Sequence, residues 1–368
     1  MKRIGTISYN IYCNFTNYGS ALQTWALLTI IKRLGCSPVL VDYCPDILAD
    51  KDPLNPFPNM WDQDEQSRRN CELTIPAIRE NYEKFDRFYY KVCPITNNKY
   101  TSANFNRVIN EEDIDGFVCG SDTIFCIDEF KGFDDGYFAN YECMKNHSVS
   151  YAASFGDAHF DETTYPALNE RLQNFKAIGI RENSMLEYVT SHTTVPCQRT
   201  IDPTLLLTSD DYDTIAAERQ VKEPYLLFYT RRYDTTMEAY AEKVAKEKGL
   251  KIVEISLRAT NMEKGHIMRY DAGVEEFLSL VKYADFVVTN SFHGLIFGVQ
   301  YKKPLVVFTR EQAGNKINEL LDLFGMQSSK FITGHERYHE IHYDVVHTNI
   351  KSAREKSITF LKMELECL

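Results

Sequence analysis

Apolar strands and amphipathic helices alternate along this chain, and their order limits it to an α/β fold. The apolar run at residues 4–8 is followed by a polar loop, a helical pattern over 21–34 that stops at Gly35, and a second apolar run at 39–41. Strand, helix and strand in this order form a βαβ unit. In such a unit the strands run parallel and the ligand-binding loops gather at their carboxyl ends.

The second half of the chain repeats this pattern. Residues 225–229 and 252–256 are predicted strands on either side of a helix at 236–248. Further strands are expected at 117–119, 148–152, 177–180, 286–288 and 304–308, and further helices at 274–283, from 294 and at 358–365. A length of 368 residues indicates two domains. We predict an N-terminal α/β domain at 1–210, a C-terminal α/β domain at 211–350 and a helix in 351–368 that packs back toward the first domain.

One region breaks the pattern. Residues 46–69 are rich in Pro, Asn, Asp and Gln and have no hydrophobic period, which predicts a long loop or lid. Helical spacing returns at 77–90, just after Pro76, a residue suited to the first turn of a helix. In a two-domain α/β chain, we expect the active site in the cleft between the domains.

Charge and composition exclude several classes of partner. Lys and Arg number 41 against 52 Asp and Glu, a net charge of −11, which disfavours nucleic acid and anionic membranes as partners. An anionic substrate therefore needs a local basic site. No apolar stretch approaches the ~20 residues of a membrane-spanning helix, so a cytoplasmic protein with at most peripheral contact to the inner face of the membrane is expected. Ten cysteines without a C-x-x-C predict reduced thiols and no zinc cluster.

Common nucleotide and hydrolase motifs are missing from the sequence. It contains no G-x-x-x-x-G-K-[ST], no G-x-G-x-x-G and no G-x-S-x-G. The segment from His335 to His339 satisfies H-E-x-x-H, but Gly334 precedes it and no amphipathic helical pattern surrounds it. We predict a solvated connecting segment here, and no metal site.

Four short segments place Gly and small polar residues just after or between apolar elements. They are Asn17-Tyr18-Gly19-Ser20, Gly120-Ser121-Asp122, the run from Ser150 to Gly156, and the run from Thr289 to Gly294. Backbone N–H groups at such strand-to-helix turns can receive an anion. Any one of these segments alone is explained as a tight turn with a helix cap. Four in one chain favour a polar ligand site.

Three residues in or after predicted strands carry candidate chemistry. His293 can exchange protons near neutral pH, and the alternative is a structural histidine at the start of a helix. Arg181 can hold a carboxylate or phosphate, and the alternative is an ion pair with Glu182 or another acid. Arg231 is also at a strand end, where an exposed surface arginine is the simpler explanation.

Taken together, the ordered segments resemble the polysaccharide pyruvyl transferase family. The resemblance rests on Asn17 to Ser20 with Gln23, residues 117–122, 150–156 and 180–182, Asp202-Pro203-Thr204-Leu205, residues 284–294, 304–308 and 315–321. It implies a GT-B-like fold of two Rossmann-like domains facing each other across a cleft. It also implies transfer of pyruvate, as a ketal, from phosphoenolpyruvate to two hydroxyls of a sugar in a cell-surface polysaccharide precursor, without a further cofactor.

The resemblance also implies roles for individual residues. His293 is the expected catalytic acid or base. The expected donor-binding residues are Arg181, Ser291, Asn290, Ser154, Arg231, Arg310 and Lys316. The expected acceptor-binding or cleft-lining residues are Asn17, Tyr18, Gly19, Gln23, Ser121, Asp122 and Phe155. Ser291 stands where some members carry Arg, so a second donor-binding cation must come from elsewhere.

Two other functions remain open on the sequence. A GT-B glycosyltransferase that uses a nucleotide sugar would share the fold, because a fold does not determine a function. A glycan-binding module without chemistry would share the polar site. The expected partners are phosphoenolpyruvate and a sugar acceptor, and the sequence leaves open whether that acceptor is a lipid-linked oligosaccharide.

Overall fold

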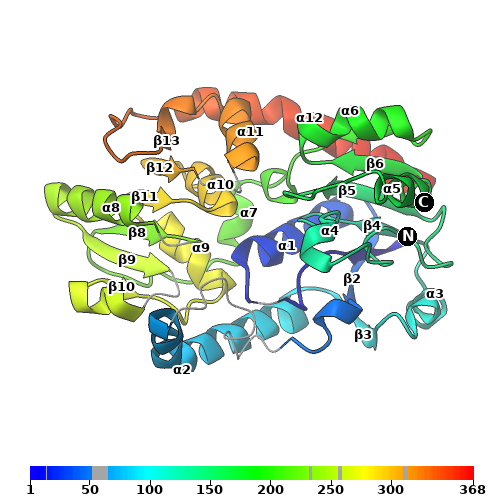
Figure 1. Cartoon of the computed structure of the whole chain (residues 1–368), viewed down its shortest axis with the longest axis horizontal. Coiled ribbons are helices and arrows are strands. Elements are labelled where there is room, and N and C mark those ends of the chain that lie inside the picture. Colours follow the sequence, from blue (N-terminus) through cyan, green and yellow to red (C-terminus); the bar gives the residue numbers. More distant parts are fainter. Residues whose placement is uncertain (14, 52–64, 232–233, 256–258, 310–313) are drawn as a thin grey trace. The chain divides into compact units, whose positions relative to one another are not determined.

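The computed structural model describes residues 1–13, 15–51, 65–231, 234–255, 259–309 and 314–368 of the chain (Figure 1). The chain divides into two compact units. Unit 1 comprises Met1–Lys51, Asp86–Leu207 and Lys351–Leu368, and unit 2 comprises Asp52–Phe85 and Thr208–Ile350. Both are α/β units built on a parallel sheet, as predicted from the alternation of strands and helices.

Unit 1 contains a seven-stranded parallel sheet. Its strand order is β3-β2-β1-β4-β5-β6-β7, the order of a Rossmann-like doubly wound fold. The strands are β1 Arg3–Ile7, β2 Ser37–Tyr43, β3 Ile95–Tyr100, β4 Gly116–Cys119, β5 Ser148–Ala153, β6 Ala177–Ile180 and β7 Cys197–Arg199. The order reverses between β1 and β4, which are hydrogen-bonded neighbours. A doubly wound sheet binds its ligands at the carboxyl ends of the strands at this point.

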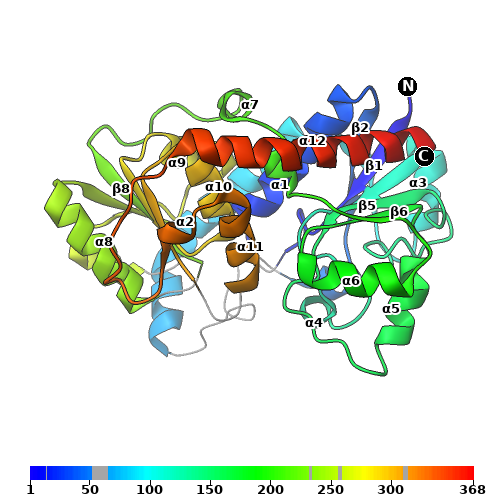
Figure 2. The ribbon, with the colours of Figure 1, turned by 90° about the horizontal axis from the view of Figure 1, so that it is seen from above.

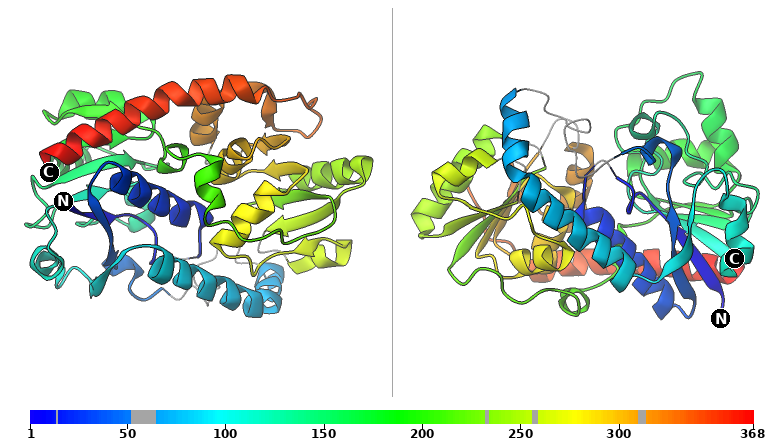
Figure 3. Two further views of the ribbon diagram at one scale, coloured as in Figure 1. Left: turned by 180° about the vertical axis from the view of Figure 1, so that it is seen from behind. Right: turned by 90° about the horizontal axis from the view of Figure 1, so that it is seen from below.

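Helices cover the sheet of unit 1. The longer ones are α1 Tyr18–Arg33, α5 Tyr165–Leu172, α6 Asn183–His192 and the unit 1 part of α12 Tyr343–Cys367; α3 Val108–Glu112, α4 Ile127–Phe130 and the π-helical turn Phe88–Val92 are short. Figure 2 shows α12 as one long helix. The N- and C-termini lie side by side (Figure 3), because Lys2 Nζ donates to the carbonyl oxygens of Leu365 and Glu366.

Unit 2 repeats the architecture with a six-stranded parallel sheet. Its order is β10-β9-β8-β11-β12-β13, so the reversal lies between β8 and β11. The strands are β8 Tyr225–Tyr229, β9 Lys251–Ile255, β10 Ile267–Met268, β11 Phe286–Thr289, β12 Leu305–Phe308 and β13 Lys330–Phe331. The helices include α7 Ser209–Asp213, α8 Thr235–Lys248, α9 Val274–Lys282, α10 Phe292–Gln300 and α11 Gly314–Phe324.

Residues 65–85 depart from the sequence prediction. Helix α2 Glu65–Arg87 begins well before the expected helix at 77–90 and keeps Pro76 in its interior. Its unit 2 part is held by Lys84, whose Nζ lies 2.8 Å from Glu276 Oε1 and 3.4 Å from Asp271 Oδ2. These long-range ion pairs explain why a segment assigned to the first domain from the sequence groups with unit 2. The expected loop over 52–64 lies outside the described residues.

The C-terminal helix is also longer than predicted. It begins at Tyr343 rather than near residue 358, and residues 351–368 group with unit 1. Arg354 attaches it there, donating from Nε to the Leu205 carbonyl oxygen at 2.6 Å and from Nη2 to that of Leu207 at 3.1 Å. Among the described helices, none is both long and apolar enough to cross a membrane.

Candidate active site

Four sequence-predicted residues of unit 2, Arg231, Asn290, Ser291 and His293, directly follow the carboxyl ends of β8 and β11. Tyr229 and Thr289 are partners in the parallel ladder, so the residues that follow each strand are neighbours. The Arg231 backbone N–H donates to Asn290 Oδ1 at 2.8 Å. This hydrogen bond joins the two strand ends where the strand order reverses, the position at which doubly wound folds bind ligands.

Helix α10 begins at this strand end for local reasons. Ser291 is its N-cap, with an extended backbone and an Oγ that accepts from Gly294 N at 3.2 Å. Thr289 Oγ1 accepts from Ser291 N at 3.0 Å and donates to the Tyr229 carbonyl oxygen at 2.8 Å. A side chain at position 294 would collide with that hydroxyl, so only Gly allows the helix to start this close to β11.

His293 lies in the first turn of α10. The residue is 7% exposed, and its ring meets that of Phe292 edge to face, with 5.1 Å between centroids. The positive end of a helix and its early backbone N–H groups favour an anion. Arg231 follows the neighbouring strand β8, so a cationic residue, an imidazole and a helix N-terminus share this edge of the sheet.

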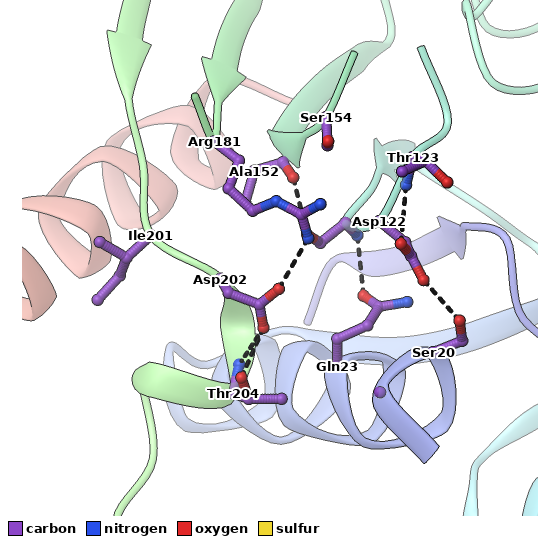
Figure 4. Close-up of polar contacts among 12 residues, drawn as sticks. Ser20, Gln23, Asp122, Thr123, Ala152, Ser154, Arg181, Ile201, Asp202 and Thr204 are labelled. Atoms are coloured by element: carbon purple, nitrogen blue, oxygen red, sulfur yellow. Dashed lines mark hydrogen bonds and ion pairs between the residues drawn. The ribbon is translucent and has the colours of Figure 1, made fainter. Parts of the chain in front are cut away.

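In unit 1, Arg181 lies in a buried network rather than at an open site (Figure 4). Its Nη1 lies 3.0 Å from Asp202 Oδ2 and its Nε lies 3.4 Å from Glu182 Oε1, and only 8% of the residue is exposed. Burial lowers the pKa of the Arg181 guanidinium, but the carboxylates of Glu182 and Asp202, with that of Asp122, outweigh burial and raise it. The ion pair given above as the alternative for Arg181 is therefore what the structure contains.

Both carboxylates of this network are supported by further donors. Ser154 Oγ donates to Glu182 and accepts from Gly156 N at 3.1 Å. Asp202 Oδ1 accepts from the backbone N–H of Thr204 at 3.0 Å and from its hydroxyl at 2.6 Å. The network thus ties the ends of β5, β6 and β7 together.

A second group of predicted residues meets where β1 and β4 end. Gln23 Oε1 accepts from Ser121 N at 2.9 Å, and Gln23 Nε2 donates to Ser8 Oγ at 2.8 Å. Ser20 Oγ donates to Asp122 Oδ2 at 2.5 Å (Figure 4). Helix α1 is placed here by its N-cap Asn17, whose side chain accepts from Gly19 N at 3.0 Å.

The remaining predicted site residues have different positions. Phe155 is 2% exposed and packs edge to face on Phe125 in the core, and its role as an acceptor-binding or cleft-lining residue stays a prediction. Tyr18 and Gly19 are buried in the first turn of α1. Lys316 is partly buried in the first turn of α11, and Arg310 lies outside the described residues.

Two acids of the unit 1 network were not predicted as site residues. Glu182 appeared only as a possible partner of Arg181, and Asp202 only as part of a family motif. The sequence does carry a signal for Asp202, because an Asp followed by Pro and Thr is typical of an N-cap. Asp202 indeed caps the 3₁₀ turn Pro203–Leu205.

The H-E-x-x-H segment forms no helix. Glu336 Oε1 accepts from the backbone N–H groups of Ile332 and Thr333, both at 2.9 Å. Burial raises the pKa of Glu336, but these hydrogen bonds prevail and lower it to about 2. Across the described ranges, His, Cys, Asp and Glu side chains form no group of three arranged to hold a metal ion.

Comparisons with known proteins give one family assignment. A family model described as polysaccharide pyruvyl transferase matches residues 17–312. No curated protein matches the sequence.

Solved structures also align over nearly the whole chain, at low similarity. A putative UDP-N-acetylglucosamine 2-epimerase from Listeria monocytogenes aligns at 10% identity and a TM-score of 0.49, over 97% of this chain and 90% of that one. The UDP-GlcNAc 2-epimerase from Methanocaldococcus jannaschii aligns at 8% identity and 0.49, over 95% and 92%. MurG from Acinetobacter baumannii aligns at 7% identity and 0.44, over 100% of both chains.

Proposed function

This chain belongs to the polysaccharide pyruvyl transferase family, and on that premise we propose that it transfers pyruvate from phosphoenolpyruvate to two hydroxyls of one sugar in a cell-surface polysaccharide precursor, forming a ketal. The observation that carries this proposal is the placement of Arg231, Asn290 and His293 just after β8 and β11, where the strand order reverses. The proposal places the reaction in the cytoplasm, at the inner face of the membrane, and uses no cofactor besides the donor substrate.

The donor is assigned to this edge of unit 2 because of its charge. Phosphoenolpyruvate carries a carboxylate and a phosphate, so a protein with a net charge of −11 must hold it with local positive groups. Arg231 and the start of α10 supply them, and Ser291 and Asn290 supply polar side chains nearby. Lys316 and Arg310 stay predicted donor contacts.

The proposed reaction needs proton transfer at both substrates. A proton adds to the methylene carbon of the donor, which becomes the methyl group. One sugar hydroxyl then bonds to the central carbon and loses its proton. The carbon–oxygen bond to phosphate breaks, inorganic phosphate leaves, and the second hydroxyl closes the ketal and loses its proton. We assign at least one of these transfers to His293, because imidazole both gives and accepts protons near neutral pH.

The acceptor is assigned to unit 1. One guanidinium, that of Arg181, faces the three carboxylates of Glu182, Asp202 and Asp122, which disfavours a polyanion there. A neutral sugar suits this edge better than an anionic ligand, because it brings no negative charge toward these carboxylates. In this proposal Arg181 and Ser154 position the strand ends rather than bind the donor. The shared cleft expected from the sequence stays a prediction.

Transfer from a nucleotide sugar is the weaker candidate. In dinucleotide-binding Rossmann folds, an acid after the first βαβ helix binds the ribose hydroxyls. The acids near the ends of the second strands here, Asp42 and Glu254, accept hydrogen bonds from the protein's own side chains. A thermal-shift comparison separates the candidates, because phosphoenolpyruvate should raise the melting temperature and a panel of nucleotide sugars should not.

Mass spectrometry tests the proposed function directly. The full chain is incubated with phosphoenolpyruvate and candidate lipid-linked oligosaccharides that contain galactose or hexosamine. We expect one product heavier by one pyruvyl ketal, with one inorganic phosphate released for each ketal formed. A glycan-binding module without chemistry would release no phosphate, and transfer from a nucleotide sugar in place of phosphoenolpyruvate would contradict the proposal.

A further inference from the structure

Two tyrosines in unit 1 are held by one buried carboxylate. Asp42 is the next-to-last residue of β2 and is 6% exposed. Its Oδ1 accepts from the Tyr12 hydroxyl at 2.6 Å, and its Oδ2 accepts from the Tyr90 hydroxyl at 2.8 Å. Tyr12 comes from the loop between β1 and α1, and Tyr90 from the π-helical turn before β3. Each ring is thereby fixed at its hydroxyl end.

These tyrosines lie beside the carboxyl edge of the sheet. Tyr12 follows β1, Asp42 is close to the end of β2, and Lys99 is close to the end of β3. The Lys99 Nζ atom lies 4.4 Å from the centroid of the Tyr12 ring. Strands β1, β2 and β3 are neighbours, and β1 borders the reversal of strand order, so this edge adjoins the region where doubly wound sheets bind ligands.

The rings remain partly accessible although their hydroxyls are engaged. Tyr90 is 38% exposed and Tyr12 is partly buried. Burial and the Asp42 carboxylate raise the pKa of both hydroxyls, so each stays a proton donor to Asp42. What these residues offer a ligand is therefore ordered aromatic surface, most of it on Tyr90, because Tyr12 packs against the core and the Lys99 ammonium lies over one face of its ring. Binding to such ordered surface costs little conformational entropy.

We propose that Tyr12 and Tyr90 form a subsite for a pyranose ring of the acceptor glycan, an inference that rests on the proposed function. The C–H groups on one face of a pyranose are weakly positive and match the negative face of an aromatic ring. The Lys99 ammonium beside Tyr12 donates hydrogen bonds to hydroxyls at the rim of the sugar. Asp42 acts through the tyrosines and is a positioning residue.

Binding to an array of immobilised neutral pyranose oligosaccharides tests the subsite without any turnover. The full chain is compared with Tyr12→Leu and Tyr90→Leu, which remove a ring, and with Tyr12→Phe and Tyr90→Phe, which remove only the hydroxyl. We expect each Leu variant to lose roughly threefold to tenfold in affinity and each Phe variant to stay close to the wild type. Tyr188→Leu is the matched control: Tyr188 is another partly buried tyrosine of unit 1, bonded to Asn169 in α5, and its loss should leave binding unchanged.

Turnover gives a second readout. In the mass-spectrometric assay, the Leu variants should raise the acceptor KM and leave the KM for phosphoenolpyruvate unchanged. Leu variants with wild-type glycan affinity and wild-type acceptor KM overturn the subsite. If the Phe variants lose as much glycan affinity as the Leu variants, stacking on the rings is not the basis of the subsite. Tyrosine-dependent glycan binding without phosphate release contradicts the proposed function and leaves the subsite standing, so the two failures are distinguishable.

Discussion

The guanidinium of Arg181 lies 3.0 Å from the carboxylate of Asp202, and both side chains are buried at the ends of neighbouring strands. A buried charge is stable only when it is paired and hydrogen-bonded. Arg181 is therefore a link between the ends of β6 and β7. A residue type that commonly holds phosphate or carboxylate ligands holds the protein's own carboxylates here.

Breaking this link should destabilise unit 1. Arg181→Met leaves Glu182 and Asp202 buried without their guanidinium, and we expect a loss of about 3–5 kcal/mol in the free energy of unfolding. Asp202→Asn should cost less, because Glu182 still pairs with Arg181. Urea unfolding of both single variants and of the double variant measures the coupling free energy between Arg181 and Asp202. Strictly additive losses in the free energy of unfolding would show that these two side chains do not interact.

His293→Gln should strongly reduce ketal formation while the fold persists. Loss of a general acid or base typically reduces turnover about 10²–10⁴-fold. His266→Gln is the matched control, since His266 is another buried histidine of unit 2, with its Nδ1 2.7 Å from Glu254 Oε2. That variant should lower the melting temperature and retain turnover per folded molecule. Wild-type phosphate release by His293→Gln would remove His293 from the proposed mechanism.

Gly294→Ala should shift the start of α10. The new methyl group would collide with Thr289 Oγ1, and this hydroxyl cannot rotate away without losing its hydrogen bonds to Tyr229 and Ser291. We expect a stability loss of about 1–3 kcal/mol and a higher KM for phosphoenolpyruvate.

Gly298→Ala, in the same helix, provides the comparison for that variant. Its methyl group would meet the flexible end of Leu305, and the higher helix propensity of Ala offsets part of the cost. Thermal unfolding and initial-rate kinetics of both variants test the prediction. Equal effects of the two substitutions would contradict a special role for position 294.

Asp134 should make stability depend on pH. Burial raises the pKa of its carboxyl to about 6, although hydrogen bonds from Tyr137 N, the Tyr43 hydroxyl and Gly136 N partly offset that rise. The unfolded chain has the ordinary value of 3.8, so the folded state binds the proton more tightly. The stabilisation by that proton is present below about pH 4 and is lost as pH rises to about 6, by at most roughly 3 kcal/mol.

Chemical unfolding between pH 4 and pH 7 measures this effect. The wild type should lose stability relative to Asp134→Asn across that window, because asparagine does not titrate. A pH-independent difference between the two proteins would contradict the raised pKa.

The positions of strands could be predicted where the strands are central in their sheets. The predicted strand at 225–229 coincides with β8, because a parallel strand buried on both faces is a continuous apolar run. The edge strands β3 and β7 were not predicted. In β3, Asn97 and Lys99 are exposed, and in β7 all three residues remain partly exposed, so neither has an apolar pattern.

The residues after the strands could be predicted as site candidates, since their types and their positions at strand ends are visible in the sequence. The hydrogen-bond and ion-pair partners of these residues could not be predicted from the sequence. Arg181 pairs with a carboxylate that follows a different strand, and Asp42 holds two tyrosines from separate segments. Hydrophobic periodicity reports whether a segment is buried, which is a local property. Whether an arginine meets a ligand or a carboxylate depends on long-range packing, and only the folded chain brings those groups together.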